Sequence, residues 1–234
     1  MVKVRNLFNI FVLCLAFLYT VQNADAIMEP PSGEFPDGAP QKIAPNEVVL
    51  TDAVMKQYKG STKDVRLVRA AETLKGTVAD YSRRAILGDN LTGKPIKLEF
   101  RDLGALNPKY ADFDALGWKQ RGRLNIFINI KHQHAPKEAL AAVLAHEAIH
   151  QDELNSLNEE VYCWTLEAAV WTQLTDDKPE LTDISSALVT RENTIKKLFV
   201  KGNYTSKYIR KSVLSNTGYQ GLPSRSPGFE DENL

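Results

Sequence analysis

The sequence contains few of the residues that build disulfide scaffolds, since only Cys14 and Cys163 occur among its 234 residues. Cys14 lies in an N-terminal segment that we expect to be removed, so the mature chain keeps one cysteine and forms no internal disulfide. The chain also lacks an excess of either charge, with 29 basic and 29 acidic side chains. This balance gives no electrostatic reason to expect a nucleic-acid partner.

The sequence also lacks a hydrophobic run as long as a membrane span. The apolar run from Leu7 to Val21 follows Lys3 and Arg5 and precedes the small-x-small sequence Ala24-Asp25-Ala26. This arrangement is typical of a secretory signal peptide, whereas a membrane span needs about 20 apolar residues. We therefore predict a signal peptide over residues 1–26, a secreted or periplasmic location and no stable membrane insertion after cleavage. An uncleaved membrane anchor is the alternative.

The rest of the chain divides by composition into three parts. Residues 27–48 are rich in proline and glycine, which predicts a linker or a short pro-segment. Residues 49–219 are long enough to form one domain with its own core. Residues 220–234 are rich in Pro, Ser, Gly and acidic residues, which predicts a disordered tail. The sequence has no internal repeats.

Hydrophobic periodicity predicts an α+β domain with a small mixed sheet. Apolar residues alternate with polar ones over residues 96–100 and more strongly over 124–130, as expected for strands. Helical patterns cover residues 52–58, 62–86, 157–174 and 183–199. Between the second strand and residue 157 lies a run that is apolar nearly all round, typical of a buried helix. The segment that contains Trp118 is expected to be a loop.

The sequence His146-Glu147-Ala148-Ile149-His150 lies within this apolar run and has the form H-E-x-x-H. Two histidines four residues apart lie one turn apart on one helix face, within reach of one metal ion. Glu147 points about 100° round the helix from His146, where its carboxylate can reach a metal-bound water without being a ligand. This is the local chemistry of zinc hydrolases. The alternative is a pair of hydrogen-bonded core histidines.

A zinc site needs a third protein ligand, and no histidine follows His150. The following helix offers Glu159, Glu160 and Glu167. Ser156 and Glu159 form an S-x-x-E capping box, which accounts for Glu159. A stripe at helical spacing, if it faces the histidines, favours Glu160 and leaves Glu167 as a weaker candidate or an outer partner. The stripe comprises Glu160, Cys163, Trp164, Glu167 and Trp171.

Other residues are open to two interpretations. Cys163 is a possible thiolate ligand, but a small buried packing residue is favoured. His132 and His134 precede the motif helix and can line a cleft, but surface loop histidines are favoured. A hydrogen-bond donor for an oxyanion is expected from a histidine or from one of three C-terminal tyrosines, without a choice between them: Tyr204, Tyr208 and Tyr219.

From about Leu124 to Leu174, the chain resembles a zincin-type metallopeptidase of the compact gluzincin-like group. The resemblance implies a zincin-like fold, Zn²⁺ bound by His146, His150 and Glu160, and Glu147 as the general base. It also implies a bound water as nucleophile and a peptide or protein as substrate. The pattern differs from thermolysin, because Trp164 stands four residues after Glu160, where thermolysin-like enzymes have an acidic residue. Asp152 and Glu153 are possible substitutes as partners of a ligand histidine.

The resemblance leaves two points open. Zincins place the edge strand of their sheet along the cleft, and residues 124–130 form either that strand or its neighbour. The whole site is alternatively a structural zinc site, or a degenerate peptidase scaffold, in a non-catalytic secreted interaction protein. An intact Glu147 counts against this second alternative, because a structural site has no use for a base.

Overall fold

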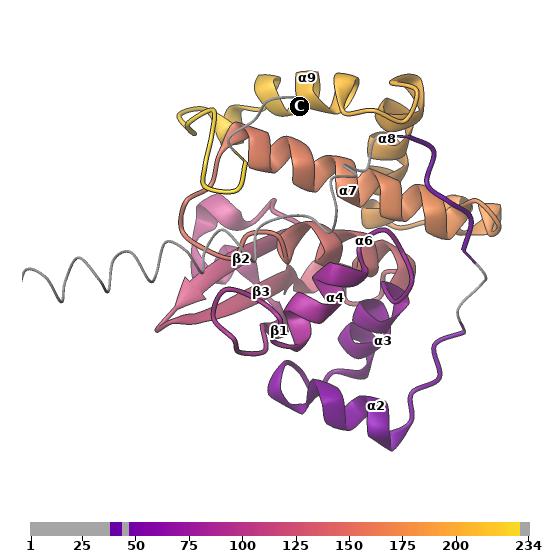
Figure 1. The fold of residues 1–234 in the computed structure, drawn as a ribbon, viewed down its shortest axis with the longest axis vertical. Helices are drawn as coiled ribbons and strands as arrows, with labels where there is room; N and C mark the ends of the chain where they lie inside the picture. The colour runs from indigo at the N-terminus through magenta and orange to yellow at the C-terminus, as the bar shows by residue number, and fades with distance from the viewer. Residues whose placement is uncertain (1–37, 44–46, 230–234) are drawn as a thin grey trace, which may run out of the picture.

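The computed structural model describes residues 38–43 and 47–229. The signal peptide predicted for residues 1–26 and most of the predicted linker lie outside the described residues. Figure 1 shows the described part as a small sheet on one side of a group of helices. The prediction of an α+β domain is confirmed at this level.

The sheet has three strands in the order β1-β3-β2. β1 (Lys97–Arg101) runs parallel to β3 (Arg123–Asn129), and β2 (Ala115–Gln120) runs antiparallel to β3. Arg121 and Gly122 join β2 to β3, and both have positive φ angles, 53° and 68°. A two-residue turn of this kind matches the twist of a hairpin and sets its register. In the strand order given above, β3 is central, so the strand predicted over residues 124–130 is the central strand of the sheet.

β2 corrects the prediction of a loop around Trp118. Its sequence, Ala-Leu-Gly-Trp-Lys-Gln, contains a glycine and lacks regular alternation of apolar and polar residues. Pairing with β3 through the tight turn, rather than local sequence preference, makes this segment a strand. β2 is an edge strand of the sheet among the described residues.

The N-terminal half of the domain forms short helices. They are α2 (Asp52–Gln57), α3 (Val65–Thr73), α4 (Asp80–Leu87) and α5 (Leu103–Leu106). The single helix predicted over residues 62–86 is wrong, because the chain turns between α3 and α4. Gly76 has a φ of 76° in that turn, and the Thr77 hydroxyl accepts a hydrogen bond from the Ala79 amide at 3.1 Å. These two features end one helix before the other begins.

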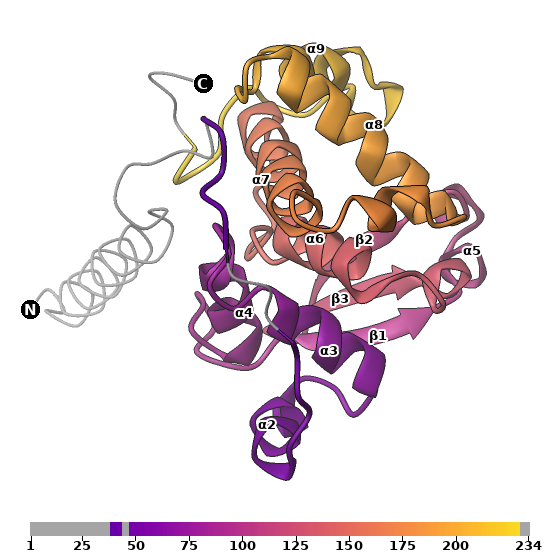
Figure 2. The same cartoon turned by 90° about the vertical axis from the view of Figure 1, so that its right-hand side faces the viewer.

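Four further helices lie around and after the motif. They are α6 (Lys137–Glu147), α7 (Leu157–Thr175), α8 (Ala187–Lys201) and α9 (Lys207–Ser215). α6 packs against α3, α4, α7, α8 and β2, with α7, α8 and α9 gathered on one side of it (Figure 2). Because α6 has neighbours on every side, residues 139–146 are all buried. α9 was not predicted from the sequence.

The segment after α9 corrects the prediction of a disordered tail from residue 220. The carbonyl oxygens of Pro223 and Ser224 accept hydrogen bonds from the first two amides of α7, at 2.9 and 3.2 Å. Phe229 is buried against Tyr162, with 5.4 Å between the ring centroids. The composition of this segment predicts disorder, but these contacts hold residues 220–229 on the domain.

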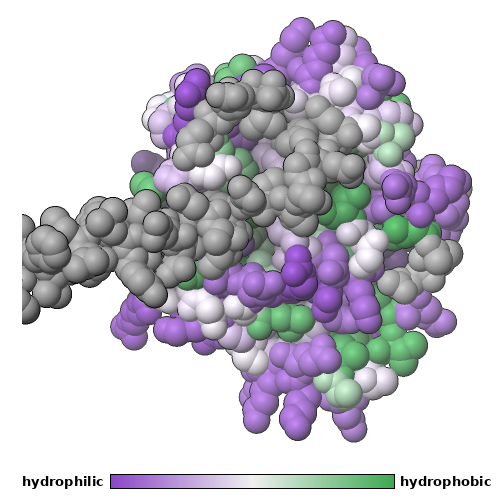
Figure 3. Space-filling model, viewed as in Figure 1, coloured by the Kyte–Doolittle hydropathy of each residue, from purple (hydrophilic) through white to green (hydrophobic). Residues whose placement is uncertain are grey.

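One face of the domain carries many polar side chains. Figure 3 shows hydrophilic side chains over α9 and over the helices at the opposite end, with smaller apolar groups between them. No helix among the described residues has both the length and the apolar character to cross a membrane.

Candidate metal centre

The two motif histidines lie at the C-terminal end of α6. His146 is in its last turn, and α6 ends at Glu147. The sequence predicts one helix through both histidines, but His150 follows the helix after a turn in which the Ile149 amide donates to the His146 carbonyl at 3.0 Å. The ring centroids remain 5.3 Å apart, so both imidazoles still face the same space.

Each histidine forms a hydrogen bond between its Nδ1 atom and a carboxylate of α7. His146 Nδ1 lies 2.9 Å from Glu167 Oε2, and His150 Nδ1 lies 2.8 Å from Glu159 Oε1. A carboxylate on one ring nitrogen fixes the tautomer and the orientation of the ring, and leaves the other nitrogen free to bind a metal. The expected substitutes Asp152 and Glu153 make no such contact, since Glu167 and Glu159 fill these roles.

The two free Nε2 atoms both face Glu160. His146 Nε2 is 3.7 Å from Glu160 Oε2, and His150 Nε2 is 3.6 Å from Glu160 Oε1. These separations exceed a hydrogen bond and suit ligands grouped around one ion. Burial acts to raise the pKa of Glu160, but the facing His150 and His146 outweigh it and lower that pKa below its usual value. Glu160 is therefore an anion at neutral pH.

The two oxygens of the Glu160 carboxylate differ in their hydrogen bonding. Oε1 accepts a hydrogen bond from Asn155 Nδ2 at 2.6 Å, while Oε2 is buried and has no hydrogen-bond partner among the described residues. An unpaired buried carboxylate oxygen is costly. A zinc ion held by His146, His150 and Glu160 removes this cost and has three protein ligands with room for a fourth, so the residues fit the metal.

Cys163 is the competing ligand. Its sulfur and one nitrogen from each of His146 and His150 lie within 4.8 Å of one another. Cys163 shares a row of α7, at four-residue spacing, with Glu159 and Glu167, which bind the Nδ1 atoms. Burial raises the pKa of the Cys163 thiol to about 12, so it is neutral without a metal. Glu160 is the other candidate, because it is an anion that faces the Nε2 atoms of both histidines.

Glu159 corrects the interpretation of the capping box. Ser156 does cap α7, since its hydroxyl accepts from the Glu159 amide at 3.2 Å. The Glu159 side chain does not return to the Ser156 amide, which donates instead to Asn155 Oδ1 at 2.6 Å. Glu159 is buried between His150 and Ser226, whose hydroxyl donates to Glu159 Oε2 at 2.9 Å. The cap therefore does not account for the Glu159 carboxylate.

Glu147 lies beside the histidines on the side of the sheet. A methyl group added to Gly117 of β2 would stand 3.3 Å from Glu147 Oε2 and 3.6 Å from His150 Cβ. The absent side chain of Gly117 lets the edge strand approach the motif closely. Burial raises the pKa of Glu147 above its usual value, although His146 and His150 act against this effect. Glu147 forms no hydrogen bond or ion pair with either histidine in the described structure.

These residues open into one cleft of about 790 Å³. Residues 115–119 of β2 form one wall, and α7 with the segment after α9 forms another. Trp118 and Phe113, each 43% exposed, add apolar surface at the opening. The lining also includes Trp164, Tyr219 and Arg191. A cleft of this size, with a few polar groups in its floor, is suited to a ligand.

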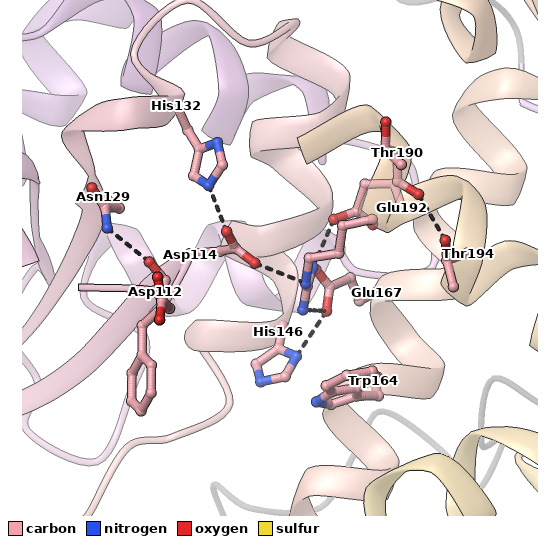
Figure 4. A network of polar contacts seen from close by, with 12 residues as sticks. Asp112, Asp114, Asn129, His132, His146, Trp164, Glu167, Thr190, Glu192 and Thr194 are labelled. Carbon is pink, nitrogen blue, oxygen red and sulfur yellow. Dashed lines mark hydrogen bonds and ion pairs between the residues drawn. The ribbon is translucent and has the colours of Figure 1, made fainter. Parts of the chain in front are cut away.

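We predicted that His132 and His134, which precede the motif helix, both lie on the surface, and this prediction is wrong for His132. His134 is exposed, but His132 is buried, and its Nε2 lies 2.6 Å from Asp114 Oδ1 (Figure 4). Asp114 Oδ2 also pairs with Arg191 Nε of α8 at 3.2 Å. Sequence reasoning missed Asp114, Arg191 and Ser226, because each reaches the site from a segment distant in sequence. No local pattern marks such contacts.

Comparison with family models, with curated proteins and with solved structures gives no match for this chain. The functional argument therefore depends on the geometry of the site.

Proposed function

We propose that this chain is a zinc-dependent peptidase with a zincin-like fold. One observation carries the proposal. His146 and His150 turn their free Nε2 atoms to Glu160, and Glu147 stands beside them in a cleft bordered by an edge strand. A structural zinc site is usually closed by four protein ligands, whereas a catalytic one leaves a position open.

The chemistry divides between the metal and Glu147. Zinc supplies Lewis acidity, which lowers the pKa of a bound water and polarises a carbonyl group. Glu147 accepts the proton of the attacking water and later delivers it to the leaving amine. The raised pKa of Glu147 suits this work, because a stronger base transfers protons more readily near neutral pH.

Tyr219 is the tyrosine that we assign to the developing oxyanion. Of the three tyrosines considered from the sequence, it alone lines the cleft. Trp164 Nε1 donates to its hydroxyl oxygen at 2.9 Å, so the phenolic hydrogen is directed at an acceptor, and Glu160 lies within reach of it. Burial, assisted by Glu160, raises the pKa of Tyr219 far above its usual value, so the hydroxyl keeps its hydrogen. A held donor of this kind stabilises negative charge in a transition state.

Replacing Tyr219 by phenylalanine is expected to reduce kcat by about 100- to 1,000-fold, the usual cost of losing one oxyanion donor. Zinc affinity should remain at the parent value, because Tyr219 is not a ligand. Steady-state kinetics and chelator competition measure the two effects. Tyr204→Phe is the control, since Tyr204 packs on Phe199 away from the cleft. Equal kcat values for Tyr219→Phe and the parent would refute the assignment.

The edge strand indicates the class of substrate. β2 has an unpaired edge among the described residues and lines the cleft along residues 115–119. An extended peptide can add itself to such an edge through main-chain hydrogen bonds. Trp118 and Phe113 offer apolar contacts to its side chains. A peptide or protein substrate therefore fits the cleft.

Metal analysis of the purified mature protein, with a cleavage assay on a broad peptide library, tests the proposed function. We expect one zinc ion per chain and metal-dependent cleavage that a chelator abolishes. Bound zinc with no exchangeable water and no cleavage would instead support a structural zinc site in a non-catalytic interaction protein. A chain that binds no zinc would exclude both functions.

Export is part of the proposal, and it depends on residues 1–26 of the sequence. The expected N-terminal residue of the exported protein is Ile27, because Ala24-Asp25-Ala26 is a typical cleavage site. N-terminal sequencing of protein recovered outside the cytoplasm measures it directly. Recovery of protein that begins at Met1 would favour the membrane-tethered alternative.

A further inference from the structure

Arg191 of α8 is the centre of a largely buried ionic network next to the metal centre. Figure 4 shows its three carboxyl partners, Asp114, Glu167 and Glu192, together with His146. Its guanidinium contacts both oxygens of Glu167, with Nη2 to Oε2 at 3.0 Å. Nη1 also donates to Glu192 Oε1 at 2.8 Å, and Nε pairs with Asp114 Oδ2 at 3.2 Å. One cation therefore joins three carboxylates from three different segments.

The first arm of the network ends on a proposed zinc ligand. Glu167 Oε2 receives both Arg191 Nη2, at 3.0 Å, and His146 Nδ1, at 2.9 Å. The Glu167 side chain is 0% exposed, so water does not solvate its charge. Without Arg191, this buried carboxylate would keep only the His146 imidazole and the neighbouring Glu192 carboxyl group as partners, a costly state. The position of Glu167 against His146 thus depends on Arg191.

The second arm ends at the edge strand. Asp114 directly precedes β2, and its other oxygen binds the buried His132 at 2.6 Å. Arg191 therefore connects Asp114, which directly precedes the cleft wall formed by β2, to Glu167, the carboxylate that contacts His146.

A role for Arg191 in binding a substrate carboxylate does not suit these contacts. Arg191 lines the cleft, but its Nε, Nη1 and Nη2 atoms are all directed at protein carboxylates. A substrate carboxylate would therefore have to displace a protein carboxyl group from the guanidinium.

We propose that Arg191 is a positioning residue, which holds Glu167 on His146 and fixes the start of β2 relative to the metal centre. This inference rests on the proposed function, because it assigns His146 to the metal. Partners that orient a ligand histidine typically change metal affinity by 10- to 100-fold, and Arg191 acts one contact further out through Glu167.

Arg191→Met removes the charge and keeps most of the side-chain length. We expect zinc affinity, measured by chelator competition, to fall about 10-fold or more, and the visible spectrum of the Co²⁺-substituted protein to shift. Arg83→Met is the matched control. Arg83 of α4 is also largely buried and pairs with Asp80 at 2.9 Å and Glu72 at 3.5 Å, away from the cleft. It should lose thermal stability but keep the parent zinc affinity and cobalt spectrum.

A second readout needs no metal. The hydrogen bond between His146 and Glu167 should give a downfield imidazole proton resonance in the metal-free protein, assigned by its loss in His146→Gln. We expect this resonance to move upfield in Arg191→Met and to stay unchanged in Arg83→Met. Arg191→Lys is a milder variant for the case in which Arg191→Met fails to fold. Its point charge cannot bridge Glu167 and Asp114 in the fork geometry of arginine, so a smaller change in the same direction is expected.

The outcomes separate the two proposals. A parent protein that binds zinc, together with an Arg191→Met variant of equal affinity, spectrum and resonance, would overturn the role of Arg191 alone. An equal loss of affinity in Arg83→Met would also overturn it, because general destabilisation would then explain the effect. A parent that binds neither zinc nor Co²⁺ would overturn the proposed function. In that case an unchanged imidazole resonance in Arg191→Met would still show that Arg191 does not position His146.

Discussion

Glu147→Gln is expected to keep its zinc and to lose peptide hydrolysis by about 100- to 10,000-fold, the usual contribution of a general base. The amide of glutamine has nearly the shape of the carboxylate, so the cleft and the approach of Gly117 are retained. It cannot accept the proton of the attacking water. Because His146, His150 and Glu160 are untouched, the metal should remain bound.

The measurement pairs kcat/KM on a peptide found in the library assay with zinc content after gel filtration. Glu153→Gln is the control, since Glu153 is an exposed carboxylate on the same cleft and should leave both quantities near the parent values. The assignment of Glu147 is wrong if Glu147→Gln cleaves peptides as fast as the parent, or if it releases its zinc.

Glu160→Ala should weaken zinc binding by more than about 100-fold, beyond the range typical of removing an orienting partner. The substitution removes one of three ligands and leaves two buried imidazoles without the anion between them. Cys163→Ser decides between the two candidate third ligands. It keeps the size of the thiol but removes the soft ligand atom, and we expect the parent zinc affinity.

Glu159→Gln provides an intermediate case in the same chelator competition. Glu159 orients His150 through Nδ1, so its loss should cost about 10- to 100-fold in zinc affinity. This expectation replaces the sequence prediction that Glu159 contributes only a helix cap. If Cys163→Ser loses the metal and Glu160→Ala keeps it, the third ligand is the thiolate and our assignment of Glu160 is wrong.

Local patterns predicted the elements that carry strong periodicity. α7 begins at Leu157, as its Ser156 cap indicates, and β3 lies within one residue of its expected bounds. β2 and α9 escaped prediction for different reasons. β2 becomes a strand through its hairpin with β3, and α9 is a short helix with only two buried residues, Ile209 and Val213.

Sequence patterns indicated which residues of the candidate site lie together, but not which residues hold them in place. Spacing alone placed His146, Glu147 and His150 together, and helical facing favoured Glu160 over Glu159. The orienting role of Glu159 was hidden, because a capping box explains the same residue. The contacts of Arg191 and Ser226 could not be predicted from the sequence. The hydrogen bond between Ser226 and Glu159, for example, joins residues 67 positions apart, and no local sequence pattern indicates it.

The contact of Ser226 with Glu159 also has a consequence for the order of synthesis. A domain emerges from the ribosome N-terminus first, at about 5–20 residues per second, so the H-E-x-x-H segment is made well before Ser226. Until residues 223–226 arrive, the first amides of α7 lack their carbonyl partners and Glu159 lacks the Ser226 hydroxyl. The nascent chain thus contains the H-E-x-x-H segment before it contains the residues that complete the contacts of Glu159 and of the first turn of α7.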